Sequence, residues 1–236
     1  MMDATQLVTG GMQILVVLLG VTVHESAHAF AARRLGDPTA AMLGRASLNP
    51  LRHLDPIGTV LVPILLVIAG LPAFGWGRPT PVLLHNFSRP RRDDMLVTAA
   101  GVCANAFLAV AATCLLPLAV AALGPQARQA GDLVLIRQVQ QAGALAGFPV
   151  VFTLVQVVYV NALLVCFNLI PVPPFDGGQL VLHLMPADWA PAYSGLRRFG
   201  FGLGLFLAFA GMALQIVYLL LLPFTLVMNL LLHLTG

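Results

Sequence analysis

The chain alternates between long apolar runs and shorter stretches rich in glycine, proline and arginine. The first apolar run predicts a helix from about Thr9 to Leu35, and Gly-Asp-Pro at 36–38 ends it. Two further spanning helices are predicted at about 95–123 and 148–168. Each run is long enough to cross about 30 Å of hydrocarbon as a helix. The pattern therefore predicts an all-α polytopic membrane protein.

Three other regions are less regular. Residues 36–56 carry turn signals and predict a short extended or hairpin element at the membrane surface. The apolar run 57–74 is barely long enough to span, so a short helix and a re-entrant segment both remain open. The long apolar stretch 199–235 predicts C-terminal helices, either divided or kinked at Pro223. Together these runs predict about five to six transmembrane helices.

Composition supports a membrane protein and excludes several other classes. Hydrophobic residues make up 59% of the chain and charged residues only 9%, which excludes an ordinary soluble domain. The net charge of +3 is small and its arginines are scattered between apolar runs, which argues against nucleic-acid binding. The three cysteines lie in apolar segments without C-x-x-C spacing and are predicted to be buried thiols.

The first apolar run contains the motif His24-Glu25-Ser26-Ala27-His28. Histidines four residues apart share one face of a helix, so both imidazoles can reach one metal ion. Glu25, the only glutamate in the chain, stands beside the first histidine, where a carboxylate can take a proton from water. The alternative is two hydrogen-bonded helix histidines with Glu25 as counter-ion. Apolar surroundings favour the metal site, because ionisable groups are costly there.

A second motif runs from Asn168 to Gly178. Its three prolines, at 171, 173 and 174, cannot continue a helix, so the backbone must unwind in protein or beside a polar cavity, at membrane depth. A catalytic zinc site needs a third protein ligand beyond two histidines. Asp176 is the natural candidate, the alternative being an ordinary turn aspartate before Gly-Gly. Asn168 either satisfies unwound carbonyl groups or hydrogen-bonds an extended substrate.

The predicted span at 95–123 carries Gly101 and Asn105 four residues apart, among several alanines. Such small residues are typical of a seam where helices pack closely. Asn105 differs from its neighbours, because a buried amide needs hydrogen-bond partners.

The two motifs together resemble the site-2 protease family, intramembrane zinc metalloproteases of the M50 peptidase type. The resemblance covers about residues 15–185 and is to a compact prokaryotic member without PDZ or CBS domains. It implies one metalloprotease domain over 1–236, with a catalytic core at about 9–185. One Zn²⁺ per chain would be bound, and the implied ligands are His24, His28 and Asp176. Glu25 would be the general base, while Asn168 and Asn105 would contact substrate or stabilise the oxyanion.

By the same resemblance, the expected reaction is hydrolysis of peptide bonds within transmembrane segments of single-span membrane proteins. The expected location is the cell (inner or plasma) membrane, as a multi-pass protein surrounded by lipid. One alternative is a catalytically inactive membrane scaffold of the same fold, which predicts that Glu25→Gln preserves function. The other is a metal-ion transporter, which predicts metal flux and a second matching site. The sequence shows no internal repeat, which counts against a transporter.

Overall fold

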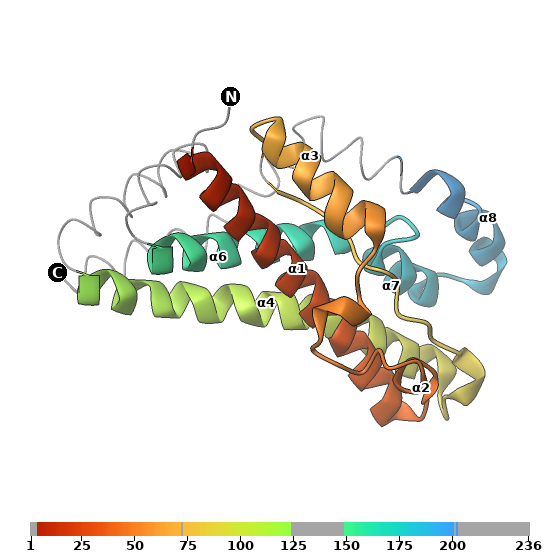
Figure 1. Ribbon diagram of the computed structural model, residues 1–236. Coiled ribbons are helices and arrows are strands. Elements are labelled where there is room, and N and C mark those ends of the chain that lie inside the picture. Colours follow the sequence, from red (N-terminus) through yellow and green to blue (C-terminus); the bar gives the residue numbers. More distant parts are fainter. Residues whose placement is uncertain (1–3, 72, 124–148, 201, 203–236) are drawn as a thin grey trace.

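The computed structural model describes residues 4–71, 73–123, 149–200 and 202 (Figure 1). Within these ranges the secondary structure is helical and contains no strand, as the all-α prediction requires. In chain order the elements are α1 (Ala4–Leu35), α2 (Thr39–Met42), η1 (Pro50–Arg52), η2 (Pro56–Leu61), α3 (Val62–Ile68), η3 (Leu84–Asn86), α4 (Pro90–Leu123), α6 (Pro149–Asn168), α7 (Asp176–Leu184), η5 (Ala187–Trp189) and α8 (Ala190–Ser194).

Three described helices are long and apolar enough to cross a membrane: Gln6–Leu35, Pro90–Leu123 and Pro149–Asn168. They match the three predicted spans. Helix α4 begins earlier than predicted, because proline is favourable at a first helical position and Asp93 caps the start by accepting a hydrogen bond from the Arg89 backbone N–H at 2.9 Å. The predicted C-terminal helices at 199–235 lie almost entirely outside the described residues, so the total of five to six spans stays a prediction.

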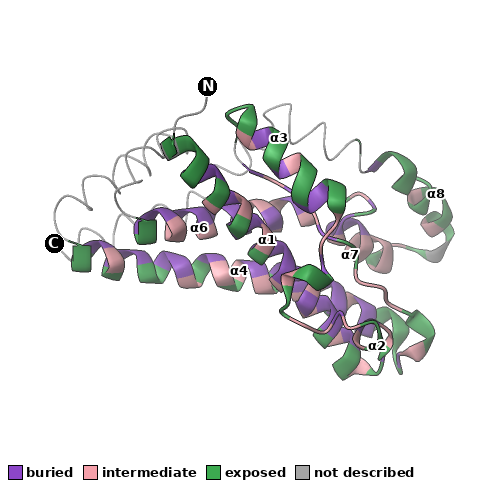
Figure 2. Cartoon of the chain, in the orientation of Figure 1, coloured by how far each residue is buried: buried purple, intermediate pink, exposed green. Residues whose placement is uncertain are grey.

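Helices α4 and α6 pack along each other, and α1 crosses both (Figure 1). Their shared core is rich in small and β-branched side chains, including Val17, Val21, Ala112, Val158 and Val160. The faces that point away from this core are exposed (Figure 2). They carry large apolar side chains, including Leu15, Leu19, Phe107 and Leu118. Exposed apolar faces of this extent are typical of helices that contact lipid.

The prediction of an extended or hairpin element at 36–56 is wrong. These residues form the single turn α2, the 3₁₀ turn η1 and connecting turns. The reason lies in the turn residues, which act as helix caps: the Asn49 side chain accepts from the Leu51 N–H at 3.0 Å. Asp55 does the same for η2, accepting from the Ile57 and Gly58 N–H groups. Asn and Asp signals predict a change of direction but do not distinguish a hairpin from a capped helical turn.

The apolar run 57–74 forms a short helix, one of the two possibilities left open by the sequence. The π-helical turn η2 continues directly into α3, and together they cover Pro56–Ile68. Thirteen helical residues extend about 20 Å, less than the about 30 Å of a hydrocarbon core. Gly70, with a φ of 73°, follows the end of the helix.

The chain unwinds at the proline-rich motif, as predicted. Helix α6 ends at Asn168 and α7 begins at Asp176. The first turn of α7 lies directly against the unwound segment: a Cβ atom on Gly177 would be 2.3 Å from the Leu169 carbonyl oxygen. A glycine is therefore required beside Asp176 for this close backbone approach. The approach fixes the position of the Asp176 backbone.

Candidate metal centre

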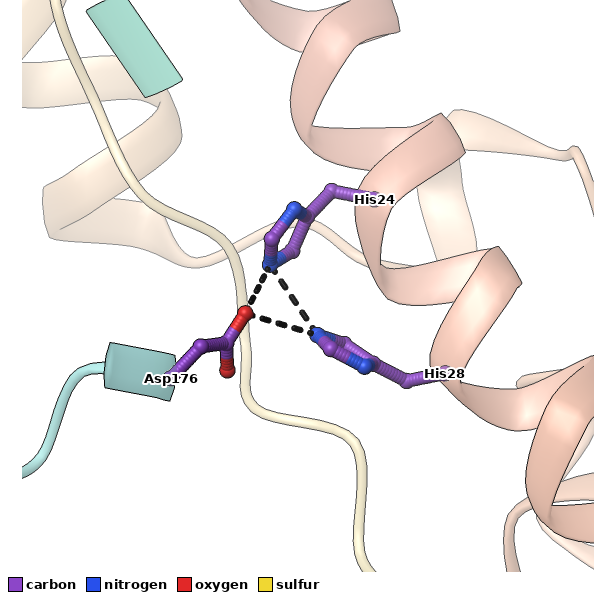
Figure 3. A group of neighbouring side chains, drawn as sticks. All are labelled: His24, His28 and Asp176. Carbon is purple, nitrogen blue, oxygen red and sulfur yellow. Dashed lines mark hydrogen bonds and ion pairs between the residues drawn. The ribbon is translucent and has the colours of Figure 1, made fainter. Parts of the chain in front are cut away.

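His24, His28 and Asp176 meet between α1 and the first turn of α7 (Figure 3). The Asp176 Oδ2 atom lies 3.2 Å from His24 Nε2 and 3.4 Å from His28 Nε2. The two Nε2 atoms are 3.0 Å apart. The four-residue spacing on α1 brings both imidazoles to one face, and the unwound segment returns Asp176 to that face. The structure thus brings together the three residues that the sequence proposed as metal ligands.

The other ring nitrogen of each histidine has a hydrogen-bond acceptor. His28 Nδ1 lies 2.8 Å from the Val97 carbonyl oxygen, and His24 Nδ1 lies 2.9 Å from Asn105 Oδ1. A carbonyl oxygen can only accept, so each Nδ1 atom carries the hydrogen. With Nδ1 occupied in this way, the Nε2 atom of each ring faces Asp176, the orientation found in metal-binding histidines.

The Asn105 side chain is fully buried behind His24, and its amide orientation is fixed by further acceptors. Its Nδ2 group donates to Asn161 Oδ1 at 2.9 Å and to the Gly20 carbonyl oxygen at 3.3 Å. Asn161 in turn donates to the Val157 carbonyl oxygen at 2.8 Å. This chain of hydrogen bonds from α6 through α4 leaves Asn105 Oδ1 as the atom that faces His24. The structure gives Asn105 a contact with a candidate ligand rather than a place in a cavity wall.

The three converging atoms form a set that suits a cation. Two imidazole nitrogens and a carboxylate oxygen face one another, all within 4.8 Å. Asp176 Oδ2 is buried and makes no hydrogen bond among the described residues beyond its close approach to the two Nε2 atoms. Three such atoms attract a positive charge between them, either a proton on an imidazole or a metal ion. Two imidazoles and one carboxylate are a donor set that catalytic zinc uses, with a fourth position left for water.

Glu25 lies next to His24 on α1 and is held by Thr80. The Thr80 backbone N–H donates to Glu25 Oε2 at 2.9 Å, and the Thr80 hydroxyl lies 2.7 Å from the same oxygen. Both donors reach Oε2, so the other carboxylate oxygen, Oε1, remains available to accept a proton. Thr80 thus fixes the only glutamate of the chain beside the candidate ligands.

Gly101 of α4 lies against both candidate histidines. A Cβ atom at this position would be 2.5 Å from His28 Nε2 and 2.8 Å from His24 Cε1. Contacts this short are essentially never made by real side chains, so the imidazoles need a glycine here. The small-residue pattern around Gly101 therefore serves the candidate site as well as helix packing.

A cavity of about 710 Å³ opens beside the three candidate ligands. Its wall includes Glu25, Thr80 and the unwound residues before Asp176, and Asn168 also lines it. The Asn168 amide donates to the Leu164 carbonyl oxygen at 2.9 Å, which satisfies a carbonyl near the end of α6. The cavity offers room beside the centre for a peptide segment, with Asn168 in its wall.

Two residues near the centre were missed by sequence reasoning. Asn161 carried a signal, because a lone amide in an apolar helix needs a partner, as Asn105 did. Thr80 carried none, since a threonine in a turn-rich segment is ordinary and its role depends on a contact 55 positions away.

Comparison with known proteins adds family information. The chain matches the family model described as Peptidase family M50 over residues 12–211. Two similar proteins carry the name "Putative zinc metalloprotease". YwhC of Bacillus subtilis (strain 168) is 34% identical over 188 residues, covering 80% of this chain and 75% of YwhC. Rip2 of Mycolicibacterium smegmatis is 32% identical over 196 residues, covering 81% of this chain and 65% of Rip2. No solved structure matches the chain.

Proposed function

The chain belongs to peptidase family M50, and on that premise we propose that it is an intramembrane zinc metalloprotease of the site-2 protease type. It hydrolyses peptide bonds within transmembrane segments of single-span membrane proteins. The observation that carries the proposal is the convergence of His24, His28 and Asp176 beside Glu25, the only glutamate of the chain.

Each residue of the centre has a distinct task. His24, His28 and Asp176 hold one zinc ion, and Asn105 and the Val97 carbonyl keep the two imidazoles in the ligating tautomer. When bound, zinc supplies Lewis acidity toward water and the substrate carbonyl. Glu25 takes a proton from the attacking water and passes it to the leaving amine nitrogen. One water is consumed and one peptide bond is broken, giving a carboxylate and an amine.

Thr80 supports this proton transfer by orientation. Its backbone N–H and hydroxyl both contact Glu25 Oε2, so Oε1 is available to the water. A fixed carboxylate needs no reorganisation at the moment of proton transfer, which lowers the barrier of the step.

The cavity beside the centre receives the substrate. A peptide bond inside a helix is hydrogen-bonded and shielded, so the substrate segment must unwind before it reaches Glu25. Asn168 lines the cavity, and its amide can bond a backbone group of an extended segment. The exposed apolar faces of α1 and α4 support contact with lipid. We infer a multi-pass protein of the cell (inner or plasma) membrane, with about five to six spanning helices in the whole chain.

The proposal is tested by reconstituting the purified protein in vesicles with single-span reporter proteins that differ in transmembrane sequence. New chain ends are identified by mass spectrometry. We expect cleavage within a transmembrane segment by the wild type and none by Glu25→Gln, while both proteins bind zinc equally. Cleavage that survives Glu25→Gln would contradict the assigned base. Zinc binding without cleavage of any reporter would favour the inactive scaffold.

A further inference from the structure

Asp94, in the first turns of α4, carries a buried carboxylate that the proposed reaction does not use. The residue is only 5% exposed. Its Oδ2 atom lies 2.5 Å from His183 Nε2 and 3.1 Å from Gln179 Nε2. Burying a carboxylate costs free energy unless hydrogen-bond donors compensate it. Both compensating donors come from one element, α7.

These two donors share a face of α7 with Asp176. Gln179 lies three residues after Asp176 and His183 lies seven residues after it, which places all three side chains along one side of the helix. Any rotation of α7 about its axis that moved Asp176 would therefore also pull Gln179 and His183 away from Asp94. We call the two contacts of Asp94 with Gln179 and His183 the Asp94 clamp.

Helix α7 is short, and polar contacts add to the close backbone approach of its first turn in setting its rotation. It has nine residues, all of them described, and a helix of this length is marginal without tertiary contacts. Its buried residues are Gly177 and Gly178, which pack against the backbone of the unwound segment but present no side chain to α4. Arg91 of α4 adds a second link by donating from Nε to the His183 carbonyl oxygen. The first turns of α4 thus supply the polar contacts that orient α7.

The same part of α4 also orients a ligand from α1. The Val97 carbonyl oxygen, three residues after Asp94, accepts the hydrogen bond from His28 Nδ1. One turn of α4 therefore contacts both elements that carry candidate ligands, and it places them relative to each other.

We propose that Asp94 is a positioning residue for the metal centre. Through the Asp94 clamp it sets the rotation of α7, so that Asp176 Oδ2 faces His24 and His28. This inference rests on the proposed function, because it takes Asp176 as a zinc ligand.

Zinc affinity of the full chain in detergent tests the inference, measured by competition with a chromophoric chelator. We expect Asp94→Ala to weaken zinc binding by about tenfold to a hundredfold, as loss of contacts behind a ligand does elsewhere. The matched control is Asp93→Ala. Asp93 is equally buried on the same turn, but its carboxylate bonds the Arg89 backbone N–H at the start of α4. We expect this control to keep wild-type zinc affinity.

Variants of His183 separate positioning from bulk packing. His183→Leu removes the donor and should weaken zinc binding as Asp94→Ala does. His183→Gln keeps an N–H donor at a similar reach and should restore affinity to within a few-fold of wild type. Hydrogen exchange of residues 176–185 provides a readout that needs no metal: exchange should rise in Asp94→Ala and stay unchanged in Asp93→Ala.

Three outcomes of these measurements would overturn the positioning role of Asp94, and one of them would also overturn the proposed function. Wild-type zinc affinity in Asp94→Ala overturns the inference, whether or not exchange in α7 changes, while the proposed function stands. An equal loss of affinity in Asp93→Ala also overturns it, because the effect is then general to the start of α4. A well-folded wild type that binds no zinc overturns the proposed function, and the positioning role falls with it.

Discussion

The Nδ1 atom of His24 lies 2.9 Å from Oδ1 of Asn105, a residue 81 positions later in the chain. This contact joins α1 to α4 at the candidate centre and fixes which imidazole nitrogen carries the hydrogen. Asn161 fixes the Asn105 amide in turn. The orientation of one candidate ligand thus depends on two buried amides from two other helices.

Asn105→Leu should therefore weaken zinc binding by about tenfold to a hundredfold, because His24 loses the acceptor that fixes its tautomer. Asn161→Leu should act in the same direction with a smaller effect, since it acts through Asn105. Asn168→Ala is the control: it lines the cavity and bonds only the Leu164 carbonyl oxygen. It should leave zinc affinity unchanged and reduce cleavage. A chelator competition assay on the three variants measures the order of their zinc affinities. Unchanged affinity in Asn105→Leu would show that Asn105 does not orient His24.

Gly101→Ala should separate zinc binding from helix stability. A Cβ atom here would lie 2.5 Å from His28 Nε2, so the two imidazoles must move and zinc affinity should fall. Alanine in a helix interior is otherwise more favourable than glycine by about 0.5–1 kcal/mol. Gly11→Ala in α1, where a Cβ atom meets nothing within 4 Å, is the matched control and should bind zinc normally. Normal zinc binding by Gly101→Ala would show that the histidines are not held as the structure has them.

Thr80→Val should slow peptide hydrolysis without loss of zinc. The substitution keeps the backbone N–H but removes the hydroxyl that contacts Glu25 Oε2. Loss of one hydrogen bond to a charged group corresponds to roughly a tenfold or greater fall in kcat. Thr80→Ser keeps the hydroxyl and should stay close to wild type. Equal rates in the valine and serine variants would show that the Thr80 hydroxyl does not support the action of Glu25.

Asp37 should make the fold sensitive to acid, from a site remote from the proposed reaction. Burial of this carboxyl favours its neutral form. Hydrogen bonds from the Thr39 hydroxyl, the Leu83 N–H, the Asn86 amide and the Thr39 N–H outweigh burial and lower the pKa of Asp37 below its usual value. They tie the turn after α1 to η3.

Because the folded-state pKa is lowered, the stabilisation is complete above the unfolded pKa of about 4. It is lost as the pH falls toward the lower folded value. Asp37→Asn cannot ionise, so the difference in apparent Tm between wild type and this variant should be largest near pH 7 and should shrink below pH 4. Thermal unfolding in detergent between pH 3 and pH 7 measures it, and a difference independent of pH would contradict the role of the charge.

Much of the candidate centre could be predicted from the sequence because its ligands lie in local patterns. The spacing of His24 and His28 is a property of one helix, and the proline run marks the break that precedes Asp176. The helix boundaries at Leu35 and Asn168 followed from local stop signals in the same way. Features that depend only on neighbouring residues, such as helix ends and ligand spacing, can therefore be predicted from a single sequence.

The remaining features depend on contacts between distant segments. Thr80 and Asp94 look like ordinary residues in the sequence, and their partners lie 55 and 89 positions away. The hairpin predicted at 36–56 failed for a different reason. Residues such as Asn49 favour both turns and helix caps, and packing against the rest of the chain decides between them.

We propose that two motifs far apart in the sequence form one zinc site. Bound zinc per chain, measured on purified protein in detergent, tests it most directly. The comparison is between wild type, Asp176→Ala and the control Asp188→Ala, which changes an exposed aspartate beyond α7. We predict about one zinc ion per chain in the wild type and in the control, and loss or strong weakening in Asp176→Ala. Equal zinc in all three proteins, or no zinc in a well-folded wild type, would show that the two motifs do not form one zinc site.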